Sequence, residues 1–153
     1  MLKYIIALIV FAVAMSLVFI RLSPVDTARF HTSAEPQPIG DYEDSTGFRV
    51  VREITETPIN VMGELNRIIL ETPRTRRVAG DLGTDLITYE TRSAIIGFPD
   101  YATISFIEPD TVGNDSVLIS IDSRLRFGAY DLGVNKRKVV AWLDALGALT
   151  VAP

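Results

Sequence analysis

The feature that most constrains this chain is an uninterrupted apolar run near its start. From Tyr4 to Ile20 the sequence reads YIIALIVFAVAMSLVFI, in which only Ser16 is conventionally polar. A helix of this length, extended by Leu2 and Leu22, is long enough to cross a hydrocarbon core of roughly 30 Å. The sequence therefore predicts a transmembrane anchor over residues 1–22.

A cleaved signal peptide is the alternative interpretation of this run. Such a peptide has a shorter apolar region followed by small residues at the cleavage site. Here VFIRLSP places bulky residues and Arg21 where cleavage would occur, which favours an uncleaved anchor. Cations lie on both sides of the run and barely discriminate between orientations. We expect a single-pass inner-membrane protein whose globular domain lies on the exported, periplasmic side.

The charge and residue content of the chain exclude several classes of function. The formal net charge of the 153 residues is −4, so bulk attraction to nucleic acid is not expected and any anion site must be local. The absence of cysteine excludes disulfides, iron–sulfur clusters and a thiol nucleophile. There is no glycine-rich phosphate loop, nucleotide fingerprint or metal-ligand cluster, so we expect no cofactor and no metal site.

Residues 23–47 have the composition of a linker. They contain several prolines and acidic residues and few apolar positions in register, which predicts an extended tether between the anchor and the domain. The single histidine, His31, lies here. No serine nucleophile or carboxylate stands at a recognisable spacing from it, so we interpret it as a linker or edge residue rather than a general base.

Residues 48–150 show the patterns of an α+β domain. Apolar residues at helical spacing predict one helix over residues 58–71 and another over 132–146. Between them apolar residues recur at every second position in three segments, and their connections are too short for crossover helices. These segments, the predicted antiparallel strands, are residues 86–95, 101–108 and 116–127. The predicted fold is an antiparallel sheet with helices packed on one face.

The opposite face of that sheet is predicted to be polar. Its residues would be Thr88, Glu90, Arg92, Thr103, Ser105, Ser120, Asp122, Arg124 and Arg126. Pairing apolar with apolar positions places Ser105 near both Arg92 and Ser120, and Tyr101 near Arg124. The face is either an ordinary solvated surface, as antiparallel sheets commonly have, or a binding surface. On this interpretation Thr103→Asp should be mild, whereas Ile104→Asp should unfold the domain.

A second candidate for a site is the stretch SRLRFGAYDLGVNKRK, residues 123–138, which gathers five cations around a helix start. Cations in a first helical turn are disfavoured by roughly 0.3–1 kcal/mol each when exposed. Their presence suggests an anion that binds the cations and the free backbone N–H groups together. The alternatives are a well-solvated surface or contact with lipid headgroups, with Asp131 serving only as a cap.

Several motifs are similar to those of a known family. These are TPRTRRVAG, TRSAIIGFPDYATI and SRLRFGAYDLGVNKRKV, together with VDTARFH after the anchor. They resemble the family called domain of unknown function 1499 over roughly two thirds of the chain. The matching positions are Arg92, Ser93, Phe98, Pro99, Asp100, Ser123, Arg124, Arg126, Gly128, Asp131, Leu132, Gly133, Val134 and Asn135. The resemblance implies a shared domain, and export in bacterial members, but supplies no catalytic residue.

Two main classes of function remain open. The first is a membrane-anchored, non-catalytic binding or accessory module for an anionic small molecule or lipid headgroup. The second is an acid–base hydrolase in which Asp100, Asp122 or Asp131 works beside an arginine. A structural partner of another membrane protein is a further alternative. The candidate binding residues are Arg92, Asp100, Arg124, Arg126, Asp131 and Asn135.

Overall fold

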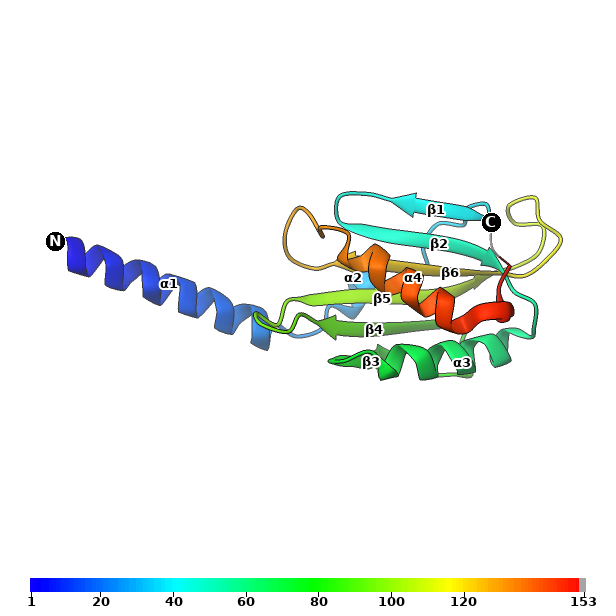
Figure 1. Ribbon diagram of the computed structural model, residues 1–153, viewed down its shortest axis with the longest axis horizontal. Coiled ribbons are helices and arrows are strands. Elements are labelled where there is room, and N and C mark those ends of the chain that lie inside the picture. The colour runs from blue at the N-terminus through cyan, green and yellow to red at the C-terminus, as the bar shows by residue number, and fades with distance from the viewer. Residues whose placement is uncertain (152–153) are drawn as a thin grey trace.

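The computed structural model describes residues 1–151 and contains one six-stranded antiparallel sheet. Its strands are β1 (Gly40–Glu43), β2 (Gly47–Glu53), β3 (Thr75–Ala79), β4 (Leu86–Arg92), β5 (Pro99–Ile107) and β6 (Leu118–Leu125). Its helices are α1 (Leu2–Leu22), α2 (Thr27–Phe30), α3 (Pro58–Glu71) and α4 (Val134–Leu146), followed by a 3-10 turn at Gly147–Leu149. The strand order is β1-β2-β6-β5-β4-β3 (Figure 1).

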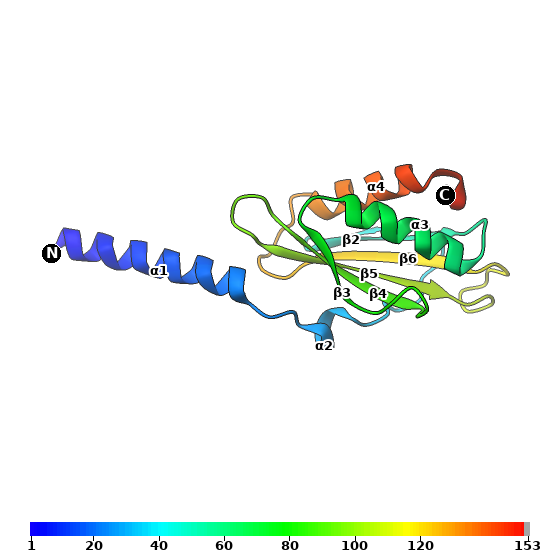
Figure 2. The ribbon, with the colours of Figure 1, turned by 90° about the horizontal axis from the view of Figure 1, so that it is seen from below.

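Helices α3 and α4 lie side by side on one face of the sheet, which confirms the predicted α+β fold (Figure 2). Helix α3 spans the predicted residues because Pro58 suits the first helical position and Pro73 follows its end. Its apolar stripe, with Leu65 and Ile69 fully buried, meets Ile104 and Ile121 of the central strands. Trp142 of α4 completes this core.

The strand register agrees with the sequence prediction at one turn and corrects it at the other. Ser105 pairs with Ser120 and Tyr101 with Arg124, as expected. Ser105 does not lie near Arg92, however, because it pairs with Leu86. The cause is the turn over residues 93–98. The Ser93 hydroxyl accepts the N–H groups of Gly97 and Phe98 at 3.1 and 2.9 Å, so β5 already begins at Pro99.

Residues 23–38 cross the second face of the sheet and are called the strap below. The structure differs here from the expected linker, and also from the expected solvated face. Phe30 is 1% exposed, and its ring stacks on Tyr101 with 4.3 Å between centroids. Thr103 Oγ1 donates to the Phe30 carbonyl at 2.5 Å, and His31 Nδ1 lies 3.0 Å from Thr88 Oγ1. The strap therefore buries the middle of the polar face.

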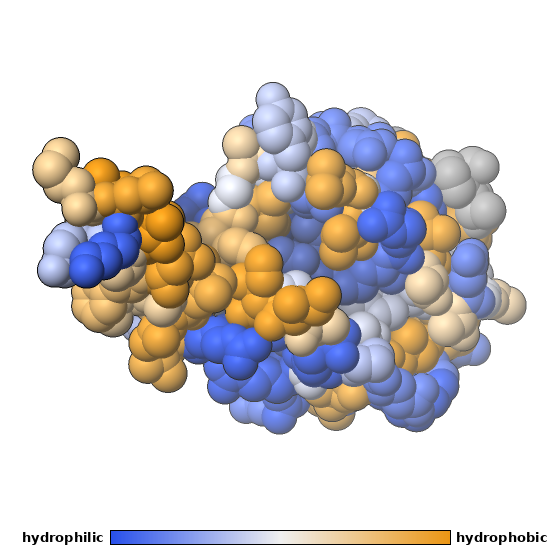
Figure 3. Space-filling model, turned by 60° about the vertical axis from the view of Figure 1, so that its left-hand side comes forward, coloured by the Kyte–Doolittle hydropathy of each residue, from blue (hydrophilic) through white to orange (hydrophobic). Residues whose placement is uncertain are grey.

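Helix α1 projects from one end of the sheet and has no buried residue (Figure 1). It is long and apolar enough to cross a membrane, although a signal sequence has the same character. Its last turn contacts the domain, because Arg21 donates from Nε to the Ile96 carbonyl at 3.1 Å and from a terminal nitrogen to the Ile95 carbonyl at 2.7 Å. Figure 3 shows the apolar helix meeting a domain surface of mixed polarity.

Candidate functional site

The residues predicted to form a site lie on both faces of the sheet and do not converge. Arg92, Arg124 and Arg126 are on the strap side, as their alternation along the strands requires. Asp100 is on the helix side, where its carboxylate lies 3.9 Å from Lys138 Nζ of α4. Asn135, also on α4, is fully buried. The predicted set therefore divides into smaller clusters, each with its own partners.

The cations of residues 123–138 likewise have separate partners. Lys136 Nζ contacts a Glu43 carboxylate oxygen at 2.5 Å, and Arg137 donates to the Leu132 carbonyl at 3.1 Å. Arg124 Nε lies 3.1 Å from Asp122 Oδ2. The cations of this stretch are therefore distributed over several local contacts.

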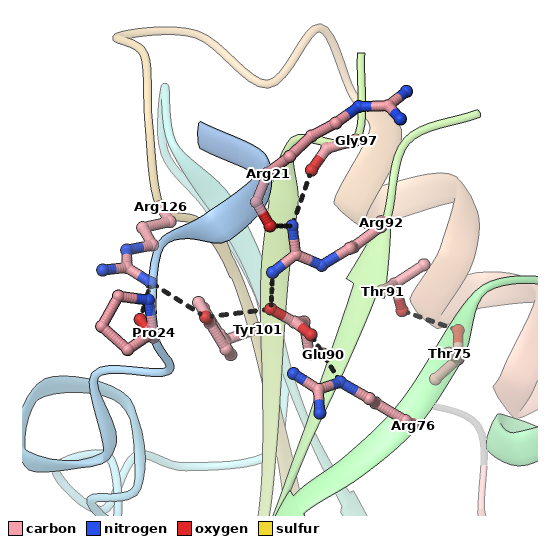
Figure 4. A network of polar contacts seen from close by, with 10 residues as sticks. All are labelled: Arg21, Pro24, Thr75, Arg76, Glu90, Thr91, Arg92, Gly97, Tyr101 and Arg126. Atoms are coloured by element: carbon pink, nitrogen blue, oxygen red, sulfur yellow. Dashed lines mark hydrogen bonds and ion pairs between the residues drawn. The ribbon is translucent and has the colours of Figure 1, made fainter. Parts of the chain in front are cut away.

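The strongest polar cluster surrounds Glu90, whose carboxylate is 1% exposed although it carries a charge (Figure 4). Arg76 Nε of β3 donates to one carboxylate oxygen at 2.7 Å, and Arg92 donates to the other at 2.7 Å. The Tyr101 hydroxyl donates to the same oxygen as Arg92, at 3.2 Å. Three neighbouring strands thus supply donors to one buried carboxylate.

The arginines keep Glu90 ionised. Burial by itself raises the pKa of the Glu90 carboxyl, because the charged form loses its water. The hydrogen bonds from Arg92 and Arg76 outweigh burial and hold the pKa below its ordinary value. The carboxylate in turn fixes the two guanidinium groups in one orientation.

The cluster also joins the sheet to the strap and to the end of α1. Arg92 donates to the carbonyl oxygens of Arg21 and Gly97, each at 3.2 Å. Arg126 donates to the Tyr101 hydroxyl at 3.2 Å and also to the Pro24 carbonyl (Figure 4). Arg92 and Arg126, both predicted as site residues, are thus linked through Glu90 and Tyr101.

Next to Glu90 lies a hollow of about 570 Å³, called the arginine hollow below. Its lining includes Arg21, Arg74, Arg76, Glu90, Arg92 and Gly97. Four arginines and one carboxylate therefore line the same hollow. Within residues 1–151, Arg74 and Arg76 use only Nε for side-chain hydrogen bonds, to the Arg92 carbonyl at 3.0 Å and to Glu90. Their terminal guanidinium nitrogens remain available as donors.

Arg74 lies in an unusual backbone conformation. Its φ is +60°, in the left-handed region that favours glycine or asparagine. An arginine there is disfavoured by roughly 1 kcal/mol. Within residues 1–151 its side chain makes a single hydrogen bond, to the Arg92 carbonyl. Strained positions of this kind are frequent at functional sites, which directs attention to the side chain of Arg74.

Arg124 lines a different hollow, of about 490 Å³, at the β1 and β2 end of the strap face. Four acidic residues and two arginines line it. Both arginines form ion pairs with Asp122, with Arg49 at 3.5 Å and Arg124 at 3.1 Å from Oδ2. An excess of carboxylates makes this hollow a poor site for an anion.

Asp131 and Asn135 organise the start of α4. The two carboxylate oxygens of Asp131 accept the N–H groups of Gly133 at 2.8 Å and Asn135 at 3.0 Å, which occupies donors that an anion would need. Asn135 Oδ1 accepts from the Ser123 hydroxyl at 2.7 Å, so it ties the helix to β6. The cap alternative accounts for Asp131, whereas the buried Asn135 Nδ2 has no hydrogen-bond partner within residues 1–151.

Asp100 and Lys138 form a buried pair. Burial lowers the pKa of Lys138 to about 8, although Asp100 opposes the shift. Burial also raises the pKa of Asp100. Lys138 Nζ has almost no contact with solvent and no hydrogen-bond partner within residues 1–151. A substrate could not reach this amine without movement of the fold, so the pair is a weak candidate for catalysis. Within the same residues, no group of three or more His, Asp or Glu side chains is placed to hold a metal ion.

Sequence reasoning missed Arg21, Arg74 and Arg76. The motif TPRTRRVAG contains the last two, but its residue pattern alone does not predict a strand. Strand β3 lies at the edge of the sheet and has little apolar alternation, because Arg76 and Arg77 are both exposed. Pairing of Arg76 with Glu90 across β3 and β4 brings these cations to the hollow.

Comparison with known proteins places the chain in a family. A search of curated proteins found no match. The family described as protein of unknown function (DUF1499) matches residues 22–146, which include all six predicted site residues and the lining of the arginine hollow from Arg74 to Gly97, but not Arg21. That match spans well over half of the sequence, so this chain belongs to the DUF1499 family.

Proposed function

We propose that this protein is a membrane-anchored, non-catalytic module that binds an anionic group, of the phosphate or carboxylate type, in the arginine hollow. The observation that carries the proposal is that, within residues 1–151, the terminal guanidinium nitrogens of Arg74 and Arg76 have no hydrogen-bond partner and lie beside Arg21 and Arg92. Arginine presents paired N–H donors in the geometry that phosphate and carboxylate groups accept.

Glu90 supports this proposal through its position. Its carboxylate holds Arg76 and Arg92 at 2.7 Å and offsets only one of the four positive charges that line the hollow. The cations are therefore fixed in place before an anion arrives, and less conformational entropy is lost on binding. A net positive field remains to attract the anion.

The placement beside α1 supports a role at a membrane. Arg21, the last cation of α1, lines the hollow, and the apolar helix is long enough to span a bilayer. The proposal places the chain in the inner membrane with a single span and the domain on the periplasmic side. A headgroup of an anionic lipid and a free phosphate present the same chemistry to these arginines.

The acid–base alternative has less support. Asp122 is committed to Arg49 and Arg124, Asp131 caps α4, and Asp100 contacts a lysine amine that is shut off from solvent. No aspartate of the three lines the arginine hollow among the described residues. Binding is therefore the function that the geometry favours.

Thermal unfolding of the full chain in neutral detergent micelles tests the proposal. Inorganic phosphate and glycerol phosphate would be added at fixed ionic strength. A ligand at about a hundred times its dissociation constant should stabilise the fold by roughly 2.7 kcal/mol, a shift of several degrees in Tm. If inorganic phosphate by itself raises Tm, the ligand of the hollow is a free anion. If Tm rises only with glycerol phosphate or with anionic lipid in the micelle, the ligand is a lipid headgroup.

Arg74→Gly is the informative variant for this experiment. Glycine suits φ +60°, so the free energy of unfolding of the variant should remain within about 1 kcal/mol of the wild-type value. The stabilisation by phosphate should be lost. Arg67→Gln is the matched control, since Arg67 lies on α3 and its side chain binds only Glu64 and Glu71 among the described residues. Equal phosphate shifts in Arg74→Gly and in the wild type would contradict the proposed site.

A further inference from the structure

Three exposed apolar side chains gather at the end of the domain from which α1 projects. Ile95 is 86% exposed, Leu132 is 84% exposed and Tyr130 is 75% exposed. Among the large apolar residues of 23–151, the next most exposed is Ile59, at 55%. Ile95 lies in the β4–β5 loop, and Tyr130 and Leu132 lie in the β6–α4 loop. These three residues are called the apolar rim below.

Both loops lie beside the last turn of α1. Arg21 binds the carbonyl oxygens of Ile95 and Ile96, so the β4–β5 loop abuts the helix end. The ring of Phe19 meets that of Phe127 edge-on, with 6.2 Å between centroids, which brings the β6–α4 loop to the same level. Figures 1 and 2 show both loops on the α1 side of the sheet. A helix that spans a bilayer leaves the hydrocarbon at this turn.

Folding alone does not explain these residues. Leu132 has φ +55°, a left-handed conformation that leucine rarely adopts, and its side chain contributes little to the core because it is exposed. A polar residue or glycine would serve the loop as well. The exposed leucine therefore suggests a contact with an apolar surface outside the chain.

Cations accompany the apolar rim. Arg126 lies over the Phe127 ring at 5.0 Å, Arg21 is bound to the β4–β5 loop, and Arg137 is bound to the Leu132 carbonyl. Aliphatic and tyrosine side chains next to arginines are typical of the interface between hydrocarbon and headgroups. Arg21 also lines the arginine hollow, so the hollow lies on the same side as this interface.

We propose that the apolar rim inserts into the interfacial layer of the lipid bilayer next to α1. The domain is then held against the membrane surface by α1 and by both rim loops, and the arginine hollow lies among the headgroups. This inference rests on the proposed membrane anchorage of α1. It does not require that the hollow bind an anion.

Site-specific fluorescence in proteoliposomes tests this inference with the full chain. The chain has no cysteine, so Ile95→Cys, Leu132→Cys and Ile59→Cys each give one position for an environment-sensitive label. Phe11→Cys, in the middle of α1, reports on the anchor. The vesicles contain phosphatidylcholine and phosphatidylglycerol, with or without a lipid carrying a nitroxide at a shallow position.

Labels at Ile95 and Leu132 should shift to shorter wavelength and lose emission to the nitroxide lipid, while resisting iodide in the water. The label at Ile59, on the exposed surface of α3, should be quenched by iodide and not by the lipid. If the two rim labels behave like Ile59 while the Phe11 label is shielded from iodide, rim insertion is wrong and the anchorage stands. If the Phe11 label is also open to iodide, the anchorage fails together with the inference.

Discussion

At the scale of single residues, the ionised Glu90 carboxylate holds the arginine cluster together. Glu90→Gln should destabilise the full chain in neutral micelles by about 2 kcal/mol at pH 7, because an amide NH₂ would face the donors of Arg76 or Arg92. Unfolding followed by the fluorescence of Trp142 measures this loss. Glu71→Gln is the control, because it removes the exposed carboxylate that pairs with Arg67 on α3. It should change stability by less than about 0.5 kcal/mol.

The effect of Glu90→Gln should depend on pH. The pKa of Glu90 is lower in the folded chain than its ordinary value of 4.5, so its contribution is present above that value and is lost as pH falls through the folded pKa. The deficit of the variant should therefore be complete at neutral pH and should narrow in acid. A deficit that is constant down to acid unfolding would mean that the carboxylate charge is not what stabilises the cluster.

Lys138 gives a second pH-dependent prediction, in which the charged form of the side chain destabilises the fold. Folding lowers its pKa from 10.5 to about 8, so between these values the unfolded chain binds more protons and stability rises with pH. The free energy of unfolding of the wild type, relative to Lys138→Met, should rise by about 3 kcal/mol across this window. Lys136→Met is the control, since Lys136 is exposed and its pKa is raised by Glu43. Parallel curves for the wild type and Lys138→Met would show that the amine is hydrated.

Residue-level prediction from sequence worked where strand alternation is strong. Arg92 and Arg126 were placed on the correct face of the sheet because neighbouring apolar residues fix which way each strand faces. Arg74 was not, because its role depends on a left-handed backbone at the end of α3 and on an edge strand without a clear pattern. Asp131 had a helix cap as its competing explanation, and its hydrogen bonds at the start of α4 agree with it.

At the scale of elements, α3 and strands β4 to β6 could be predicted because one face of each is buried in a shared core. The strap could not. Its prolines and polar residues are typical of a linker, and what holds it are contacts such as Phe30 on Tyr101 that join distant parts of the sequence. Local periodicity carries no information on such a contact.

The strap reverses one expectation about the sheet. Thr103 is 3% exposed beneath the strap and donates to the Phe30 carbonyl, so Thr103→Asp should not be mild. A carboxylate would face that carbonyl oxygen as a buried, unpaired charge and should destabilise the fold by about 3 kcal/mol. Urea unfolding of the full chain in micelles measures the change. Thr111→Asp, in an exposed loop, is the control, and equal stability of the two variants would mean that the strap leaves this face open.

At the scale of the whole molecule, the arrangement places the arginine hollow, the apolar rim and the end of α1 at one end of the sheet. Arg92 connects all three parts, because it contacts Glu90, the Arg21 carbonyl and the β4–β5 loop at Gly97. A bound anion would therefore add to interactions that already hold the anchor and the domain together.

The most direct test is to observe the guanidinium groups themselves. NMR spectra of the arginine Nε–H groups would be recorded for the full chain in neutral micelles during a titration with glycerol phosphate at fixed ionic strength. The account predicts that the signals of Arg74 and Arg76 shift together and saturate, while those of Arg49 and Arg67 do not move. Saturable shifts at Arg49 and Arg124, or no saturable shift at any arginine, would contradict an anion site in the arginine hollow.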